Sequence, residues 1–165
     1  MSDATPRPPS RVRATWAGDH LFDTGRPGGK IAPIDGAGQT AQSPPDALLS
    51  ALATCSGVDV VDILAKRRTP VEKLTVDVEA TRRANPPRRF VHIRLTFAVD
   101  GAGIARTHAE RAVRLAFETY CSVAASLAPD IVVEAMVKLN GDDGEFLRQP
   151  IFVEREDQQR GTALA

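Results

Sequence analysis

The chain of 165 residues predicts one domain of mixed α and β structure. Two kinds of segment carry this prediction. Short segments with alternating polar and apolar residues occur in both halves of the chain and indicate strands, whereas two longer segments have apolar residues at helical spacing. Clusters of glycine and proline separate these segments and mark turns.

The N-terminal part predicts a β-meander. Residues 11–16 alternate polar and apolar and predict a strand, and residues 21–22 continue it after a turn. Residues 31–34 form a short apolar third segment that is followed by a glycine-rich loop. Residues 1–10 contain three prolines and are expected to be a flexible leader.

A long helix is predicted from Ser43 to about Arg68. Ser43 can cap its first turn, two prolines suit that turn, and Asp46 faces the positive end of the helix dipole. Basic residues suit the other end, and Pro70 stops the helix. Tight packing against another helix is expected because the middle of the helix is slender, with Ala51, Ala53, Cys55 and Gly57.

The second half predicts a hairpin, a broken helix and a last strand. Residues 74–81 and 90–99 predict two strands joined by a proline turn. Residues 104–128 predict a helical region with a break around Cys121, which places that cysteine at a helix start. Residues 131–139 alternate again and predict the last strand.

These elements predict a domain over residues 11–140 and a polar C-terminal tail over residues 141–165. The tail has one apolar patch, residues 150–153, and predicts either disorder or a strand added to a partner.

Charge and hydropathy exclude some classes of partner. The 21 basic and 21 acidic residues cancel, which gives no reason to expect nucleic acid or an anionic membrane as partner. No segment is expected to span a membrane, and no targeting signal is predicted. We therefore expect a cytoplasmic protein, in which a cysteine pair is catalytic, sensing or inert rather than a permanent crosslink.

The two cysteines, Cys55 and Cys121, are the main candidates for chemistry. They are the only residues with an obvious nucleophilic chemistry, because the sequence lacks a serine nucleophile elbow and a phosphate-binding glycine loop. Thiol redox chemistry is the first hypothesis. The alternative is that both cysteines are small buried hydrophobic residues in a helix interface.

Other candidate sites are weaker. His20, His92 and His108 fall on a turn, a strand and a helix without ligand spacing, so we expect no zinc site that combines them with the cysteines, and no other metal or cofactor. Four arginines flank the proline turn and suggest an anion patch, although a solvated charged turn is the commoner outcome: Arg82, Arg83, Arg88 and Arg89.

The order of elements and two cysteine motifs resemble the OsmC/Ohr family, especially its YhfA-like branch. The first motif is Cys55-Ser-Gly-Val-Asp-Val-Val-Asp-Ile-Leu-Ala-Lys, and the second is Tyr-Cys121-Ser-Val-Ala. The resemblance covers about Arg11 to Leu139. It implies an α+β fold in which antiparallel sheets wrap around two central cysteine-bearing helices of an intertwined, obligate homodimer.

The resemblance also implies a reaction. The cysteine matching Cys55 attacks an organic hydroperoxide and becomes a sulfenic acid, which the cysteine matching Cys121 captures as a disulfide. A dithiol, lipoyl-type in some members, then reduces the disulfide. The implied substrates are bulky apolar peroxides, and the implied role is an oxidative stress response without a cofactor.

The groups that activate the thiol in the family depart from the pattern in this chain. The family's glutamate at the helix start falls at Pro45, with Asp46 displaced by one position. Its hairpin arginine falls at residues 18–20, which contain no arginine, although His20 can donate a hydrogen bond. The nearby cations that can replace it are Arg11, Arg13 and Arg26.

Local charges predict opposite effects on the two thiols. Asp59 and Asp62 follow Cys55 by one and two helical turns, and if they lie close they raise the pKa of that thiol. Cys121 at the first turn of a helix feels the positive end of the dipole, which predicts a lower pKa.

Two other interpretations stay open. A non-catalytic member would be a dimeric protein that binds a small apolar ligand in the same interface cleft, with packed, unreactive cysteines. A thiol redox sensor would change its dimer on disulfide formation instead of turning over. An arginine near Cys55 favours the enzyme, and buried thiols without a cation favour the binding protein.

Overall fold

The computed structural model describes residues 8–142 and 146–147. The chain forms two compact units, the first ending at Leu49 and the second beginning at Ser50. In the first unit, three strands form an antiparallel sheet in the order β1-β2-β3: β1 (Arg13–Gly18), β2 (Leu21–Gly25) and β3 (Ile31–Asp35). The predicted β-meander is confirmed.

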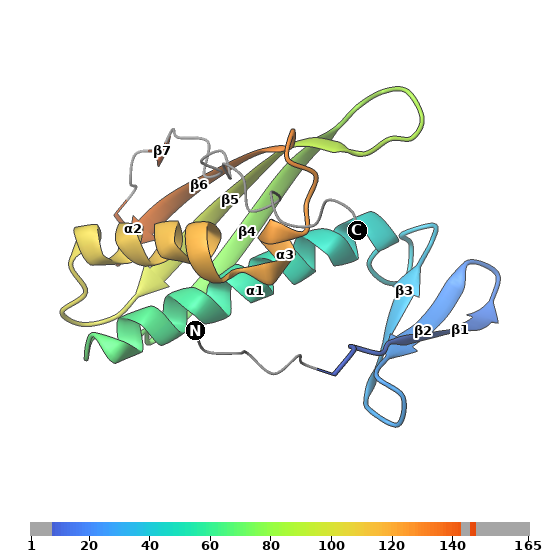
Figure 1. Cartoon of the computed structure of the whole chain (residues 1–165), viewed down its shortest axis with the longest axis horizontal. Helices are drawn as coiled ribbons and strands as arrows, with labels where there is room; N and C mark the ends of the chain where they lie inside the picture. Colours follow the sequence, from blue (N-terminus) through green and yellow to red (C-terminus); the bar gives the residue numbers. More distant parts are fainter. Residues whose placement is uncertain (1–7, 143–145, 148–165) are drawn as a thin grey trace, which may run out of the picture. The chain divides into compact units, whose positions relative to one another are not determined.

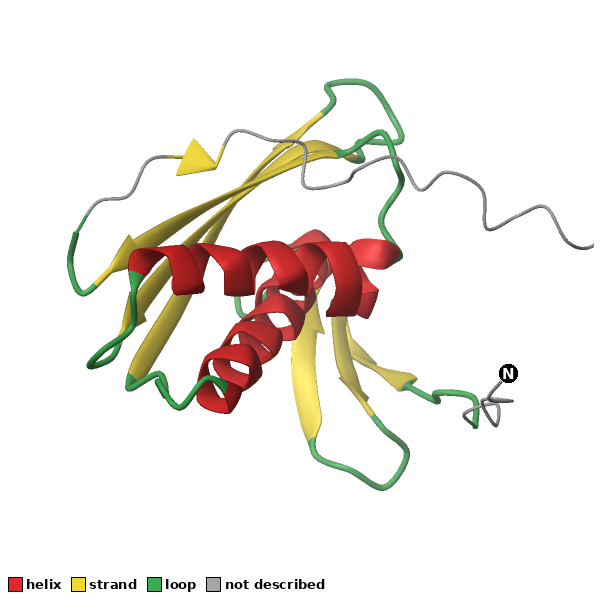
Figure 2. Cartoon of the chain, turned by 60° about the vertical axis from the view of Figure 1, so that its left-hand side comes forward, coloured by secondary structure: helices red, strands yellow, loops and turns green. Residues whose placement is uncertain are grey.

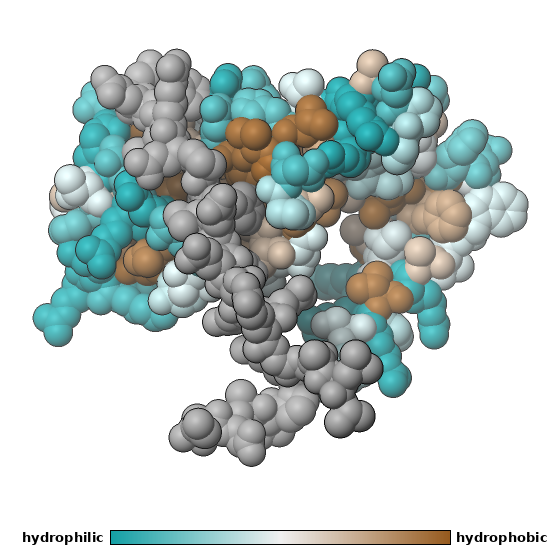
Figure 3. Space-filling view, turned by 45° about the horizontal axis from the view of Figure 1, so that its top comes forward, coloured by the Kyte–Doolittle hydropathy of each residue, from teal (hydrophilic) through white to brown (hydrophobic). Residues whose placement is uncertain are grey.

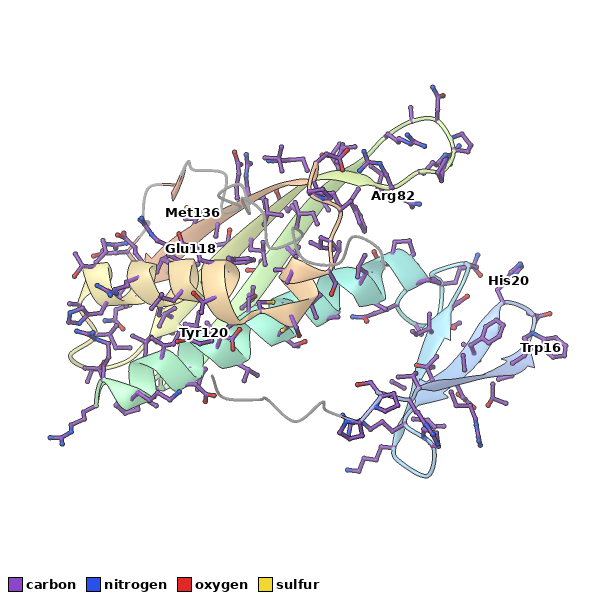
Figure 4. All side chains as sticks on the ribbon, in the orientation of Figure 1. Trp16, His20, Arg82, Glu118, Tyr120 and Met136 are labelled. Atoms are coloured by element: carbon purple, nitrogen blue, oxygen red, sulfur yellow. The ribbon has the colours of Figure 1, made fainter. Side chains whose placement is uncertain are left out.

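The hairpin of the first unit is fixed by its turn. Asp19 has a positive φ, and the indole nitrogen of Trp16 donates a hydrogen bond to its carbonyl oxygen at 2.9 Å. Trp16 and His20 both extend from this hairpin (Figure 4). The loop after β3 is held by Asp35, whose carboxylate accepts hydrogen bonds from the backbone amides of three residues, Ala37, Gln39 and Thr40.

The second unit contains a four-stranded sheet in the order β4-β5-β6-β7 (Figure 1). Its strands are β4 (Lys73–Arg82), β5 (Phe90–Asp100), β6 (Val132–Leu139) and β7 (Phe146–Leu147). β4 and β5 form the predicted antiparallel hairpin, but β5 and β6 pair in parallel. The expectation of antiparallel sheets is therefore wrong for this pair. The helical region between β5 and β6 returns the chain to the end of the sheet at which β5 begins, so β6 runs in the same direction as β5.

Helices occupy one face of this sheet (Figure 2). They are α1 (Pro44–Lys66), α2 (Arg106–Leu115), the π-helical turn η1 (Ala116–Tyr120) and α3 (Ser122–Ala125). α1 starts with the predicted cap, since the Asp46 backbone amide donates to the Ser43 hydroxyl at 3.4 Å and the Ser43 backbone amide donates to the Asp46 carboxylate at 3.2 Å.

The core lies between the helices and the inward face of β5 and β6. From Ile93 onward in β5 and from Val133 onward in β6, every second residue is buried, as alternation predicts. Phe97 of β5 meets Phe117 of η1 edge to face, with ring centroids 6.2 Å apart. α1 adds Leu52, Val60 and Leu64, none of which is exposed.

The slender middle of α1 lies beside β4 at Gly57. A side-chain carbon at Gly57 would lie 3.5 Å from Leu74 and 3.6 Å from Val76, both on β4. Both distances are ordinary van der Waals contacts, so Gly57 faces β4 within this chain. The prediction that the slender residues serve packing against another helix stays a prediction.

α1 is an apolar helix that the chain covers only in part. By length and composition alone it passes the test for a membrane-crossing helix, with a mean hydropathy of 1.7, contrary to the expectation that no segment would do so. The core helices of soluble proteins pass the same test, so this is weak evidence for a membrane span. Only 28% of the apolar window is buried in the chain. Apolar side chains also reach the surface between polar ones elsewhere (Figure 3).

The predicted C-terminal tail contributes β7, which pairs antiparallel with β6 of its own sheet. The predicted apolar patch at residues 150–153 lies outside the described residues.

Candidate functional site

Cys55 and Cys121 lie together in the second unit, although 66 positions separate them in sequence. Cys55 is on α1, and Cys121 is the residue that precedes α3. Their sulfur atoms and one carboxylate oxygen of Asp59 all lie within 4.8 Å of one another. Both cysteines are free thiols. The fold therefore forms a cluster of two thiols and a carboxyl group, which we call the thiol cluster.

The position of Cys121 follows from a break in the helical region. α2 passes into the π-helical turn η1, and Cys121 then adopts an extended conformation with φ −68° and ψ 99° before α3 begins. Its backbone amide donates to the carbonyl of Ala116 at 2.7 Å, which closes the π-helical turn. The predicted break around Cys121 is confirmed, and π-helical turns are frequent at functional sites.

Burial controls the Cys121 thiol. The pKa of this thiol is raised from 9.0 to about 11, mainly because burial disfavours the thiolate, although the Ala124 backbone amide donates to its sulfur and lowers the pKa. The neighbouring Cys55 side chain raises the pKa further. The predicted lowering by a helix start is wrong, because α3 has only four residues and the thiol is 2% exposed.

The Cys55 thiol is half-buried, so it is the more accessible of the two. Its sulfur lies 4.0 Å from the hydroxyl oxygen of Ser122. The polar groups that the described part of the second unit brings to it are thus a hydroxyl, a thiol and a carboxyl group, none of which is a cation. Ser122 was not among the predicted site residues, although its position directly after Cys121 was a signal for it.

Asp59 is one of the two acidic residues that the sequence placed near Cys55; the other is Asp62. Burial, followed by the charge of Asp62, raises the pKa of the Asp59 carboxyl group. Its Oδ2 atom is buried and makes no hydrogen bond to any described residue. Asp62 is exposed and lines a groove outside the thiol cluster. Of the two predicted carboxyl groups, Asp59 is therefore the one that joins the thiols.

Alkylation is expected to distinguish the two thiols. Near neutral pH, iodoacetamide should label Cys55 and spare Cys121, because Cys121 is buried and stays protonated up to about pH 11. Labelling of Cys121 should increase as the pH rises towards that value. Peptide mapping after timed alkylation measures both rates, and denatured protein is the control in which both thiols react. Equal native rates near neutral pH would contradict this description.

The raised pKa of Cys121 also affects stability. The folded chain holds the Cys121 proton more tightly than the unfolded chain. The stability that this proton contributes to the folded state is therefore complete at pH values below 9.0, the ordinary pKa of the thiol. It is lost as the pH rises through about 11.

A separate apolar groove of about 390 Å³ lies between α1 and β4. It is on a different face of α1 from the thiol cluster, because none of the three cluster residues lines it. Val58, which is 60% exposed, is the most exposed of its large apolar side chains. The lining residues are Ala53, Thr54, Gly57, Val58, Val61, Asp62, Leu74 and Val76.

The predicted supporting residues belong to the first unit, whereas the thiol cluster belongs to the second. Asp46 caps the start of α1, as its helix position predicts. Arg13 and Arg26 are exposed residues of the first unit, on β1 and in the turn after β2. Their predicted role in activating Cys55, like that of Arg11 and His20, stays a prediction.

Two of the histidines and the turn arginines have partners outside the thiol cluster. His92 is 3.2 Å from the carboxylate of Glu134, and His108 is 2.8 Å from the guanidinium of Arg67. Three of the turn arginines donate to backbone carbonyls of their own loop, whose base carries Arg82 (Figure 4): Arg82, Arg83 and Arg88. The fourth, Arg89, pairs with Asp130. These contacts stabilise the turn and account for its arginines.

Comparisons with known proteins identify a family. A family model described as OsmC-like protein matches residues 36–136. Protein YhfA of Escherichia coli (strain K12) is 38% identical over 118 residues, which are 71% of this chain and 88% of that protein.

Solved structures show the same fold. An OsmC-like protein from Mycoplasma pneumoniae has a TM-score of 0.68 at 18% identity and covers 78% of this chain and 95% of its own. The organic hydroperoxide resistance protein OhrB of Bacillus subtilis has a TM-score of 0.51 at 19% identity, with coverage of 78% and 96%. At these identities the likeness shows the fold alone.

Proposed function

This chain belongs to the OsmC-like protein family, and on that premise we propose that it is a thiol-dependent peroxidase that reduces organic hydroperoxides in an oxidative stress response. The observation that carries the proposal is the pair of free thiols, Cys55 and Cys121, with sulfur atoms within 4.8 Å. Cys55 is the nucleophile and Cys121 is the resolving thiol. A dithiol of the lipoyl type is the proposed reductant.

The proposed reaction has three balanced steps. The Cys55 thiolate attacks the outer peroxide oxygen, the O–O bond breaks, and the alkoxide takes up a proton to leave as an alcohol, with Cys55 oxidised to a sulfenic acid. The Cys121 sulfur then attacks the sulfenic sulfur, and water leaves as the disulfide forms. The external dithiol reduces the disulfide through a mixed disulfide and is itself oxidised.

The exposure of the two cysteines supports the proposed roles. A peroxide must reach the attacking sulfur, and Cys55 is half-buried whereas Cys121 is 2% exposed. Burial also keeps Cys121 protonated, since its pKa is about 11. A disulfide requires the sulfur atoms to approach to about 2.05 Å. The sulfur atoms now lie within 4.8 Å, so the proposed disulfide requires them to approach by up to about 2.8 Å.

The test is consumption of cumene hydroperoxide by the reduced full chain with dihydrolipoamide as reductant and a chelator present. We expect many turnovers per chain, with slower consumption of hydrogen peroxide because the proposed substrates are bulky and apolar. Absence of turnover with both peroxides would reject the peroxidase.

A redox sensor is the second candidate, and the raised pKa of Cys121 favours it. A buried, protonated thiol is a poor nucleophile and resolves a sulfenic acid slowly. A sensor would form the Cys55–Cys121 disulfide once per oxidation event, without sustained peroxide consumption. The same assay distinguishes the two, because the amount of peroxide consumed per chain is near one for a sensor and far above one for an enzyme.

We also propose that the chain is an obligate homodimer in which a second copy covers the groove between α1 and β4. A long apolar helix with only 28% of its window buried needs a further contact in water. The apolar rim residues Val58 and Val61 are 60% and 37% exposed. The first unit likewise leaves apolar side chains exposed, with Val12, Trp16 and Ile31 at 75%, 64% and 65%.

Val58→Glu is expected to convert the dimer to a monomer or to prevent accumulation of folded protein, because it places a charge in the proposed interface. Sedimentation at micromolar concentration measures the mass. Val132→Glu is the matched control, since Val132 is 47% exposed at the start of β6 and lies outside the groove. A wild-type chain that sediments as a monomer would contradict the dimer.

A further inference from the structure

We propose that Cys55, Asp59 and Cys121 form a binding site for a thiophilic divalent metal ion such as Zn²⁺. Two thiolates and one carboxylate match the ligand types that zinc prefers. The sequence directed attention to the histidines instead, and none of these belongs to the thiol cluster. The metal site requires no peroxidase activity, so it stands independently of the proposed function.

The spacing of the three ligand atoms is close to that of a zinc site. Zinc binds sulfur at about 2.3 Å and carboxylate oxygen at about 2.0–2.2 Å, which places tetrahedral ligand atoms within about 4 Å of one another. The thiol cluster spans at most 4.8 Å, so its atoms need to approach by about 1 Å. Rotation of three short side chains supplies a movement of this size.

The fold fixes two of the ligands on one helix face. Cys55 and Asp59 are four residues apart on α1, and residues at this spacing point to the same side of a helix. Paired ligands four residues apart on a helix are a recurrent arrangement in zinc sites. Cys121 approaches from the break between η1 and α3, so the three ligands come from two separate segments.

The Asp59 carboxyl group gives an independent indication of a ligand. Its Oδ2 atom is buried and has no hydrogen-bond partner among the described residues. A buried polar atom without a partner is costly, and in native proteins such atoms commonly bind water or an ion. A metal ion held by the two sulfurs would lie within reach of this carboxylate, and its two positive charges would offset two of the three negative charges of the ligands.

The site would be open rather than closed. Three protein ligands leave the fourth tetrahedral position for water or an external ligand. The half-buried Cys55 provides access from solvent. Metal binding replaces the thiol protons, and it requires both cysteines to be reduced. A disulfide between them would therefore abolish the site.

The test uses Co²⁺ as a spectroscopic substitute for Zn²⁺ on the reduced full chain, with no peroxide present. We expect one Co²⁺ per chain with thiolate-to-metal charge-transfer absorption, and complete displacement by Zn²⁺. Isothermal titration with Zn²⁺ then measures affinity, for which we expect a micromolar or lower Kd. A wild-type chain that binds neither ion, or binds Co²⁺ without charge transfer, would overturn the proposal, and this result does not depend on any variant.

Variants assign the ligands. Asp59→Asn should weaken Zn²⁺ binding by at least about tenfold, because even outer partners of zinc ligands contribute this much. Cys121→Ser should reduce the charge-transfer absorption. Asp77→Asn makes the same chemical change at an exposed residue of β4 and should bind as the wild type does. Equal affinity of Asp59→Asn and wild type would exclude Asp59 and reject the site as proposed.

The metal site and the peroxidase activity can be rejected independently of each other. Peroxide turnover is measured with a chelator, and metal binding is measured without peroxide. If the chain binds Zn²⁺ but does not consume peroxide, only the proposed function is rejected. If it consumes peroxide but binds neither Zn²⁺ nor Co²⁺, only the metal site is rejected.

Discussion

Cys55→Ser is expected to reduce turnover of cumene hydroperoxide to the uncatalysed rate, a loss of roughly a thousandfold or more. A serine hydroxyl remains protonated where a thiol ionises, and it cannot form a sulfenic acid. Cys121 cannot replace the lost nucleophile, because it is 2% exposed and its pKa is about 11. The measurement is steady-state peroxide consumption with dihydrolipoamide.

Thr54→Ser is the matched control for this variant. Thr54 is the neighbouring residue on α1, its hydroxyl donates to the carbonyl of Ser50 at 2.8 Å, and serine can keep this hydrogen bond. Turnover of Thr54→Ser should equal that of the wild type. Turnover of Cys55→Ser near the wild-type rate would show that the attacking group is elsewhere.

Cys121→Ser is expected to separate peroxide attack from regeneration. The first equivalent of peroxide should still be consumed, because Cys55 is intact. Sustained turnover should fall at least about tenfold, since an intramolecular thiol acts at an effective concentration far above that of a free dithiol. Without the resolving thiol, the sulfenic acid remains exposed to further oxidation.

Mass spectrometry of peroxide-treated Cys121→Ser measures this outcome. A sulfenic acid trapped by dimedone on Cys55, followed by a sulfinic acid at higher peroxide concentration, is expected. Ser126→Ala is a suitable control, because Ser126 is an exposed residue just after α3 and its hydroxyl bonds only within that turn, to the Ser122 carbonyl at 2.8 Å. Wild-type turnover in Cys121→Ser would mean that the dithiol reduces Cys55 directly and that Cys121 has no resolving role.

The elements of the fold could be predicted because their signals are local. Alternation identifies residues 74–81 and 90–99, which the structure extends by a residue or more to β4 and β5. Ser43 and Asp46 locate the start of α1 through the hydrogen bond that they form. The break before Cys121 is also local, because it interrupts a single helical segment.

The pairing of strands and the contacts of α1 could not be predicted in this way. The parallel pairing of β5 with β6 depends on the path of the intervening helices, which no periodicity within either strand specifies. Small residues on a helix indicate close approach without identifying the neighbour. Gly57 predicted a helix contact, and within this chain the side chains nearest to it are Leu74 and Val76 of β4.

The sequence predicted which residues form the candidate site better than it predicted the pKa of its thiols. The two cysteine motifs identified Cys55 and Cys121, and helical spacing placed Asp59 on the face of Cys55. The pKa of Cys121 depends on the number of atoms around it, and burial outweighs the nearby backbone amide. The contact between Cys55 and Ser122 at 4.0 Å joins two segments, so spacing along the chain could not show it.

The central claim is that Cys55 and Cys121 act as one redox pair. The most direct measurement is peptide mapping of the reduced chain after one equivalent of cumene hydroperoxide, under non-reducing conditions and with excess thiol blocked. The account predicts a disulfide that joins Cys55 to Cys121 within a single chain, formed in step with peroxide consumption and reversed by dihydrolipoamide. Consumption of peroxide with both cysteines recovered as free thiols, or with Cys55 oxidised to a sulfinic acid and Cys121 still free, would contradict it.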